Sequence, residues 1–245
     1  YSSMVYATAA IAFLSFVVWA HHMFTVGMPI AGELYFMYAT MLIAVPTGVK
    51  VFNWITTMYR GSLTFETPML FSIAFVILFT FGGFTGMMLS IAAADMQYHD
   101  TYFVVAHFHY VMVAGAVFSG TAAVYYWLPK WCGKMYNETM GKVQFWIAFI
   151  GFNITFMPQH FLGLAGMPRR YADYGLQFAD WNMVSSIGAF MYGGAQILFL
   201  FNVVRTIGWG EPTKDPKVWE GAEGLEWTLP TPAPYHTFAK PPKIK

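Results

Sequence analysis

Five of the seven histidines in this chain form three compact groups. His21 and His22 are adjacent, His99 is followed directly by an aspartate, and His107 and His109 are separated by one phenylalanine. Imidazole binds copper, zinc and haem iron, so histidines grouped at short spacing indicate metal chemistry. The alternative for each group is a set of hydrogen bonds between helices.

His107 and His109 lie two positions apart within a long apolar stretch. Successive residues of an α-helix are turned by about 100°, so these two side chains point about 200° apart and cannot chelate one metal ion. Imidazoles on opposite flanks of one helix suit two separate planar cofactors, because haem iron accepts a single proximal histidine from such a position. The sequence therefore predicts two haem sites on one helix, with two unrelated polar contacts as the alternative.

The other two histidine groups are incomplete as metal sites. His21 and His22 diverge by about 100° on a regular helix, so a shared metal ion requires the helix to have ended. A further ligand must then come from elsewhere. His99 and Asp100 offer one nitrogen and one carboxylate, an incomplete site for Mg²⁺ or Mn²⁺. A helix N-terminal cap by Asp100 is the other explanation of that pair.

Lys50 is the only lysine inside an apolar stretch. Thr40, Thr47 and Lys50 recur at intervals of seven and three residues, so they share one face of a helix. Hydroxyls and a lysine on one face can hold a chain of water that carries protons. The alternative is a lysine that extends to the membrane surface, with threonines bonded to backbone carbonyls.

These groups must be positioned by helices that cross a membrane. The 245 residues are 57% hydrophobic and only 10% charged, whereas soluble domains carry about 25% charge. A net charge of +1 gives no basic field for nucleic acid. A spanning helix needs about 20 mostly apolar residues. Six stretches meet or approach this length: 4–20, 36–59, 68–92, 102–128, 143–163 and 183–207. We predict an all-α, polytopic transmembrane bundle over 1–207, followed by an extended tail over 208–245 that is rich in Pro and Trp.

Basic residues set the orientation that we expect for the bundle, since they gather on the inner side of a membrane. The residues at span ends that share one side are Arg60, Lys130, Lys134, Lys142 and Arg205. Arg169 and Arg170 lie on the opposite side, near the expected level of the histidines. Paired arginines there can bind carboxylates such as haem propionates. We attribute the glycines of GGFTG (82–86) to close packing of helices.

Four motifs carry a resemblance to a known family. WAHHMF, ATMLIAVPTGVKVFNW, HDTYFVVAHFHYV and MPQHFLGLAGMPRRY occur in this order, followed by LEWTLPTPAPYHTF in the tail. In order and spacing they resemble the C-terminal half of subunit I of haem–copper oxidases, over essentially the whole chain. The resemblance implies six of the twelve helices of that subunit. It also implies reduction of O₂ to water with electrons from cytochrome c, coupled to proton pumping.

The resemblance implies a role for each matching residue. His21 and His22 would be two ligands of copper B. His107 would bind the high-spin haem a3, and His109 the low-spin haem a. The polar residues at the outer level would be the propionate partners Arg169 and Arg170, the Mg or Mn ligands His99 and Asp100, and Asp95 in the same region. The family's lysine proton pathway would contain Thr40, Thr47 and Lys50, with Asn53 here at a position that is usually serine.

The resemblance also implies partners. The third copper histidine, the second axial histidine of the low-spin haem and another proton pathway belong to the N-terminal half of subunit I, so we expect this chain to be a piece of a longer protein. Subunit II with dinuclear copper A, subunit III and the electron donor cytochrome c would complete the enzyme. We expect it in a bacterial cytoplasmic membrane rather than in mitochondria. The alternatives are a quinol oxidase of the same family and a non-catalytic, haem-holding membrane protein.

Overall fold

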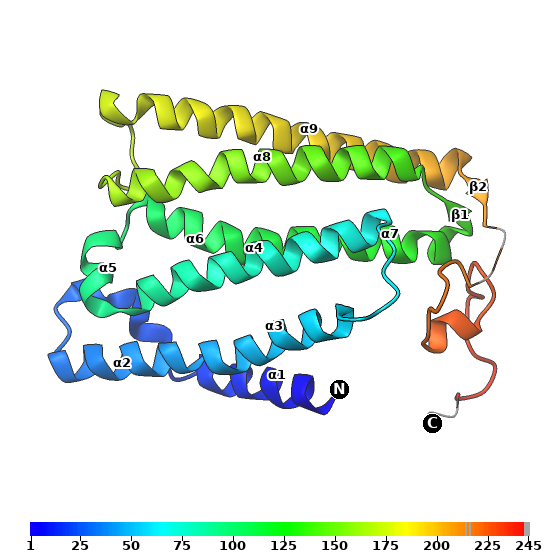
Figure 1. Ribbon diagram of the computed structural model, residues 1–245, viewed down its shortest axis with the longest axis horizontal. Coiled ribbons are helices and arrows are strands. Elements are labelled where there is room, and N and C mark those ends of the chain that lie inside the picture. Colours follow the sequence, from blue (N-terminus) through cyan, green and yellow to red (C-terminus); the bar gives the residue numbers. More distant parts are fainter. Residues whose placement is uncertain (214, 216, 243–245) are drawn as a thin grey trace.

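The computed structural model describes residues 1–213, 215 and 217–242. It shows a bundle of long helices in which successive spans run in opposite directions (Figure 1). Within these residues, six helical segments are long and apolar enough to cross a membrane, the number that the sequence predicts. The segments are α1 (Ser2–Ser15) with the 3₁₀ helix η1 (Trp19–Val26), α2 (Ile30–Leu42) with α3 (Ala44–Met58), α4 (Thr67–Ser90), α6 (Tyr102–Met112) with the π-helix η2 (Val113–Phe118) and α7 (Ser119–Cys132), α8 (Glu138–Leu164), and the 3₁₀ helix η3 (Leu176–Phe178) with α9 (Ala179–Trp209). The protein is therefore an all-α integral membrane protein.

The second and fourth spans are interrupted close to the predicted site residues, whereas the sequence predicts each of them as one continuous helix. α2 ends at Leu42 and α3 begins at Ala44, because Pro46 has no N–H to donate to the carbonyl of Leu42. In the fourth span the π-helix η2 begins four residues after His109. Single π-helical turns inside α-helices are frequent at functional sites.

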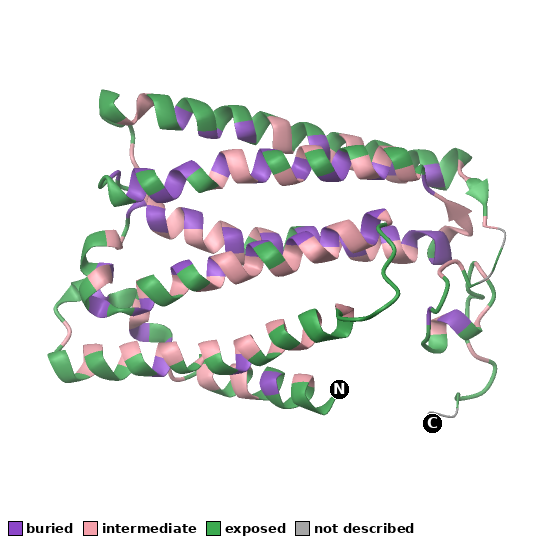
Figure 2. Cartoon of the chain, in the orientation of Figure 1, coloured by how far each residue is buried: buried purple, intermediate pink, exposed green. Residues whose placement is uncertain are grey.

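The helices pack in two groups (Figure 1). α1, α2 and α3 lie together, whereas α4 and α6 to α9 form the larger group, in which α8 and α9 run side by side. The hydrophobic core belongs to the larger group and contains the buried aromatic residues Phe71, Tyr110, Phe118, Tyr125 and Phe152. Figure 2 shows the buried residues concentrated on these helices, while α1 to α3 are largely exposed.

Glycines on α8 allow its two neighbours to approach closely. A Cβ atom on Gly163 would overlap the backbone of Phe103 at the start of α6. A Cβ atom on Gly151 would lie 2.8 Å from the backbone nitrogen of Tyr192 on α9. Small residues at such contacts let helix backbones come together in a membrane, where no hydrophobic force drives the helices to associate. α8 is thereby held firmly against α6, the helix that carries His107 and His109.

The two ends of the bundle are built differently. At one end, here called the outer end, the short helix α5 (Ala92–Tyr98) and the loop after α8 meet. There Tyr102 N donates to the carbonyl of Met167 at 3.0 Å and Arg169 N to that of Asp100 at 2.8 Å. At the inner end the two-residue strands β1 (Lys134–Met135) and β2 (Glu211–Pro212) pair antiparallel. The sequence analysis does not predict this strand pair.

The polypeptide after α9 lies against the inner end of α7. Trp219 Nε1 donates to the carbonyl of Tyr126 at 2.8 Å, and the two rings stack with centroids 5.8 Å apart. The buried Lys130 donates from Nζ to the carbonyl of Leu229 at 2.6 Å. α9 ends at residue 209, two residues later than the boundary at 207 that the sequence analysis expects. Residues 214, 216 and 243–245 of the expected tail lie outside the described residues.

Candidate metal-binding site

The α-helix of the first span has ended before the histidine pair. α1 stops at Ser15, and His21 and His22 lie on η1, in which Met23 has the non-helical dihedral angles φ −124° and ψ 16°. The Nε2 atoms of the two histidines are 3.0 Å apart, and their ring centroids are 4.1 Å apart. Two imidazole nitrogens that converge in this way can share one metal ion, which adjacent residues of a regular α-helix cannot do.

Thr40 orients the ring of His21. His21 Nδ1 lies 3.1 Å from Thr40 Oγ1, and that hydroxyl donates its own hydrogen to the carbonyl of Phe36 at 2.5 Å. Because Thr40 can then only accept a hydrogen bond from His21, Nδ1 carries the proton and Nε2 keeps its lone pair. An outer hydrogen bond of this kind fixes the tautomer that a metal-binding histidine requires.

The two histidines of α6 face different helices. His107 Nδ1 lies 2.9 Å from the carbonyl oxygen of Gly82 on α4. His109 Nδ1 lies 2.7 Å from the carbonyl oxygen of Val105, and its ring stacks on Phe156 of α8 with centroids 4.2 Å apart. A carbonyl only accepts, so each Nδ1 donates and each Nε2 is left with a lone pair. The divergence that the two-residue spacing predicts is present, and both rings have the tautomer that suits an iron ligand.

Glycines on α4 make room for His107. A Cβ atom on Gly86 would lie 2.7 Å from His107 Cε1, and one on Gly82 would lie 3.0 Å from Tyr110 Cβ. Gly83 has nothing within 4 Å, so two of the three glycines serve helix packing. The packing of α4 on α6 thus seats the imidazole of His107 against the glycines of α4.

His99, Asp95 and Asp100 meet at the outer end. Asp95 is buried, and its Oδ2 lies 3.0 Å from His99 Nδ1, while His99 Nε2 lies 3.7 Å from Asp100 Oδ2. Burial raises the pKa of Asp95, and the hydrogen bond to His99 opposes that rise. The interpretation of Asp100 as the helix cap is wrong. Thr101 caps α6 and accepts from Phe103 N at 3.3 Å, because Asp100 has a left-handed backbone (φ 54°).

Arg169 and Arg170 lie at the same outer end. Arg169 Nε is 3.9 Å from Asp100 Oδ1, a long ion pair. The exposed side chain of Arg170 has no ion-pair or hydrogen-bond partner in the part of the chain that the structure describes. A guanidinium without a partner beside a second arginine can take up a carboxylate from a cofactor.

None of the histidine groups is a complete metal site in this chain. Across residues 1–213, 215 and 217–242, no three side chains of His, Cys, Asp or Glu are gathered so that they could hold a metal ion. The donors themselves fit copper and haem iron, because three of the four imidazoles present an oriented Nε2 lone pair.

Lys50 and Thr40 both face the first span, across a line of contacts that we call the polar seam. It consists of three pairs: His21 Nδ1 with Thr40 Oγ1 at 3.1 Å, Lys50 Nζ with Thr8 Oγ1 at 3.5 Å, and Ser3 Oγ with Asn53 Oδ1 at 3.1 Å. The seam runs from the histidine pair to the inner end of α1 and persists across the break at Ile43. Thr47 is not part of it: its hydroxyl donates to the carbonyl of Ile43 at 2.8 Å and makes no hydrogen bond to α1 among the described residues.

His160 stands alone in the sequence, and its spacing predicts no role in a site. This side chain is only 5% exposed, and neither ring nitrogen has a hydrogen-bond partner among the described residues. The rings of Phe81, Phe103 and Tyr110 surround it, with centroids 5.3 to 5.5 Å away. Only the packing of α4, α6 and α8 reveals this environment, so no pattern in the sequence could have indicated it.

Comparisons with known proteins agree on one family. The family model described as "Cytochrome C and Quinol oxidase polypeptide I" matches residues 1–191. The chain is 54% identical over 244 residues to cytochrome c oxidase subunit 1 of Cereibacter sphaeroides, covering 99% of this chain and 43% of that protein. It is 55% identical over 249 residues to cytochrome c oxidase subunit 1 of Bacillus sp. (strain PS3), covering 100% of this chain and 40% of that protein. The chain therefore spans about two fifths of the length of these relatives.

A solved structure shows the same fold. The chain of a "heme-copper terminal oxidase dimer" superposes with a TM-score of 0.74 at 18% sequence identity, covering 84% of this chain and 42% of that chain.

The hydrogen bond from His21 to Thr40 makes a prediction about metal binding. Replacing Thr40→Val removes the hydroxyl that accepts from His21 Nδ1, so we expect the copper affinity of the histidine pair to fall by about 10- to 100-fold. The measurement is copper retained by the purified, assembled protein during titration with a chelator. Thr47→Val is the matched control, since Thr47 also bonds a carbonyl of its own span but touches no histidine. Equal copper retention in the two variants would contradict the role of Thr40.

Proposed function

Because the chain belongs to the cytochrome c and quinol oxidase polypeptide I family, we propose that it forms the C-terminal half of the catalytic subunit of a terminal oxidase. The complete enzyme would reduce O₂ to water with electrons from cytochrome c and couple this reaction to proton pumping. The observation that carries the proposal is the convergence of the Nε2 atoms of His21 and His22, which lie 3.0 Å apart.

The histidines would hold the redox cofactors. His21 and His22 are proposed as two ligands of copper B, His107 as the ligand of the high-spin haem a3, and His109 as a ligand of the low-spin haem a. When bound, these groups supply electron transfer and the centre at which oxygen is reduced. Hydrogen bonds from the Nδ1 atoms to the hydroxyl of Thr40 and to the carbonyls of Gly82 and Val105 hold three of the imidazoles in place.

The outer end of the bundle would bind the haem propionates and a Mg or Mn ion. Arg169 and Arg170 are proposed to pair with haem propionates, which suits the side chain of Arg170 in particular because it has no ion-pair partner among the described residues. His99 and Asp100 would bind Mg or Mn. Asp95 accepts from His99 Nδ1, so its proposed role is to orient His99 rather than to bind the metal directly.

The polar seam would deliver protons. Lys50 lies between the inner pair of the seam and the histidine pair, and its ammonium is within 3.5 Å of the hydroxyl of Thr8. We propose that Lys50 receives protons from the inner side and passes them towards Thr40, with Thr47 contributing through water. Protons and electrons that arrive from opposite sides separate charge across the membrane, which stores about 2.3 kcal/mol per charge for each 100 mV.

The proposed partners follow from what this chain lacks. The N-terminal half of subunit I would provide the remaining copper and haem ligands. Subunit II with dinuclear copper A, subunit III and cytochrome c would complete the route for electrons. The six apolar spans and the two bacterial relatives support a bacterial cytoplasmic membrane as the location.

The electron donor can be tested on the assembled oxidase. The family description covers quinol oxidases as well, whereas the relatives are cytochrome c oxidases. We expect oxygen uptake with reduced cytochrome c and only background uptake with a reduced quinol, measured with an oxygen electrode. A His107→Ala complex is the control that should abolish uptake. Uptake with quinol alone would assign the chain to the quinol branch, and no uptake with either donor would favour the non-catalytic alternative.

The proton role of Lys50 gives a second prediction. In Lys50→Met, reduction of the high-spin haem and copper B should slow strongly, because the accompanying proton has no carrier, while reduction of the low-spin haem remains fast. Stopped-flow absorbance separates the two phases. Lys217→Met, in the tail, is the control and should behave as the unmodified enzyme. Unchanged high-spin reduction and turnover in Lys50→Met would refute the role.

A further inference from the structure

A second group of polar side chains lies at the inner end of the larger helix group, whereas the polar seam lies among α1, α2 and α3. We call it the inner polar cluster. Its members are Thr67, Tyr125, Tyr136, Glu138, Gln144 and Asn202. All except Glu138 are at most 4% exposed. Four polar atoms in this cluster have no hydrogen-bond partner among the described residues: Thr67 Oγ1, the phenol oxygen of Tyr136, Glu138 Oε2 and Gln144 Nε2. Burying an unpaired polar group is costly, so four together require a common explanation.

Three of these atoms belong together: Glu138 Oε2 is part of a carboxylate that Thr67 and Tyr136 adjoin and that Lys142 Nζ approaches to 3.5 Å at Oε1. Thr67, the first residue of α4, donates from its backbone nitrogen to Glu138 Oε1 at 2.8 Å, which leaves Oε2 unpaired. Gly141 makes room beside Thr67, because a Cβ atom there would lie 2.5 Å from Thr67 Oγ1. Burial, with a smaller contribution from Glu138, raises the pKa of Tyr136. The phenol therefore stays protonated and keeps a hydrogen to donate.

The fourth atom belongs to the same cluster through Tyr125. Its hydroxyl donates to Gln144 Oε1 at 3.4 Å and accepts from Asn202 Nδ2 at 3.4 Å. The rings of Tyr125 and Tyr136 lie with centroids 4.7 Å apart. Gln144 Nε2 is thus a buried donor that has no hydrogen-bond partner among the described residues.

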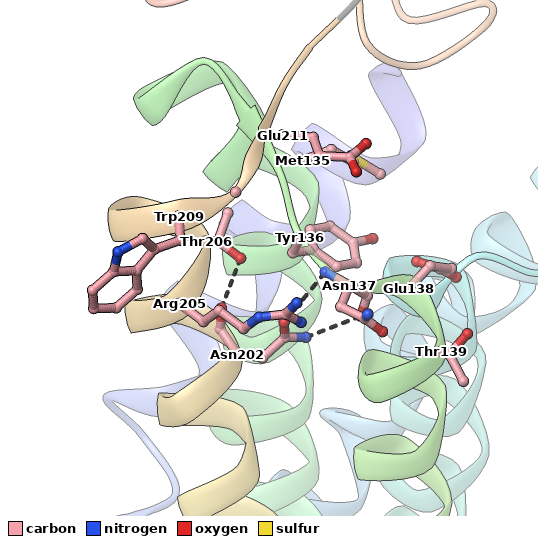
Figure 3. Close-up of a pocket in the computed structure, with 11 residues that line it drawn as sticks. Met135, Tyr136, Asn137, Glu138, Thr139, Asn202, Arg205, Thr206, Trp209 and Glu211 are labelled. Atoms are coloured by element: carbon pink, nitrogen blue, oxygen red, sulfur yellow. Dashed lines mark hydrogen bonds between the residues drawn. The ribbon is translucent and has the colours of Figure 1, made fainter.

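A cavity leads to the cluster (Figure 3). It has a volume of about 290 Å³, and its lining includes Tyr136, Glu138 and Asn202 from the cluster. Figure 3 shows Arg205 and Trp209 of α9 on the side opposite Tyr136 and Glu138. Polar cavities hold water, whereas apolar ones stay dry, and a water takes about 30 Å³ of liquid volume. This cavity is large enough for several waters.

We infer that the inner polar cluster binds ordered water, held between Thr67, Tyr136 and Glu138 and supplied from this cavity. One water can accept from the phenol of Tyr136, donate to Glu138 Oε2 and make a third bond with Thr67 Oγ1. Buried waters typically make about three hydrogen bonds. Gln144 Nε2 donates to a second water. Water here joins the start of α4 to the start of α8 in place of direct side-chain bonds.

The water can be observed directly in a cryo-electron microscopy map of the assembled oxidase. We expect separate density about 2.7–3.2 Å from Thr67 Oγ1, the phenol oxygen of Tyr136 and Glu138 Oε2. A map that resolves other buried waters but shows none here would overturn the inference. Density with contacts of about 2.3–2.5 Å would also overturn it, because such distances identify a cation.

Removing one hydroxyl tests the inference by the direction in which the thermal denaturation midpoint changes. If water pairs with Thr67 Oγ1, Thr67→Val should lower the thermal denaturation midpoint of the complex by about 2–4 °C, and Tyr136→Phe should do the same. If the hydroxyls are truly unpaired, both substitutions remove a burial penalty and the midpoints should rise or stay unchanged. Thr155→Val is the matched control, because Thr155 is equally buried but its hydroxyl donates to the carbonyl of Gly151 at 2.7 Å. Because this substitution removes a hydroxyl that is paired within the protein, its midpoint should fall by a comparable amount, which sets the scale for Thr67→Val.

Discussion

Polar side chains inside a membrane-spanning bundle need partners within the protein, because lipid provides none. For three of the histidines proposed as ligands, the partner of the Nδ1 atom is a carbonyl or a hydroxyl. Gly82 and Val105 accept from the two histidines of α6, and Thr40 accepts from His21. These bonds satisfy one nitrogen of each ring and leave the other nitrogen with a lone pair. The same interaction therefore stabilises the fold and prepares the ligands.

Helix packing decides whether these bonds can form. The carbonyl of Gly82 reaches His107 only because α4 approaches α6 closely, and Gly86 leaves space for the imidazole. Gly163 holds α8 against the start of α6 in the same way. Glycine is unfavourable inside a helix by about 1 kcal/mol relative to alanine. Here the cost is offset by contacts that a Cβ atom would prevent, so these glycines connect the architecture of the bundle to the site.

The features that the sequence could predict are those that depend on one helix alone. The number of spans follows from length and hydropathy, and the divergence of His107 and His109 follows from helix geometry. The convergence of His21 and His22 depends on where α1 ends, which the sequence indicates only indirectly. The alternative interpretation of Asp100 as the cap of α6 is wrong because a cap depends on the backbone angle of the residue. The environment of His160 and the inner polar cluster arise from helices far apart in the chain, so no local pattern predicts them.

The central claim is that α6 carries two separate haem irons on its two flanks. The most direct measurement is the dithionite-reduced absorption spectrum of the assembled complex, compared between His107→Ala and His109→Ala. We expect two spectrally distinct haems in the unmodified protein. We also expect His107→Ala to perturb only the high-spin signal and His109→Ala only the low-spin signal. Loss of the same signal in both variants, or two unchanged haems in either, would contradict it.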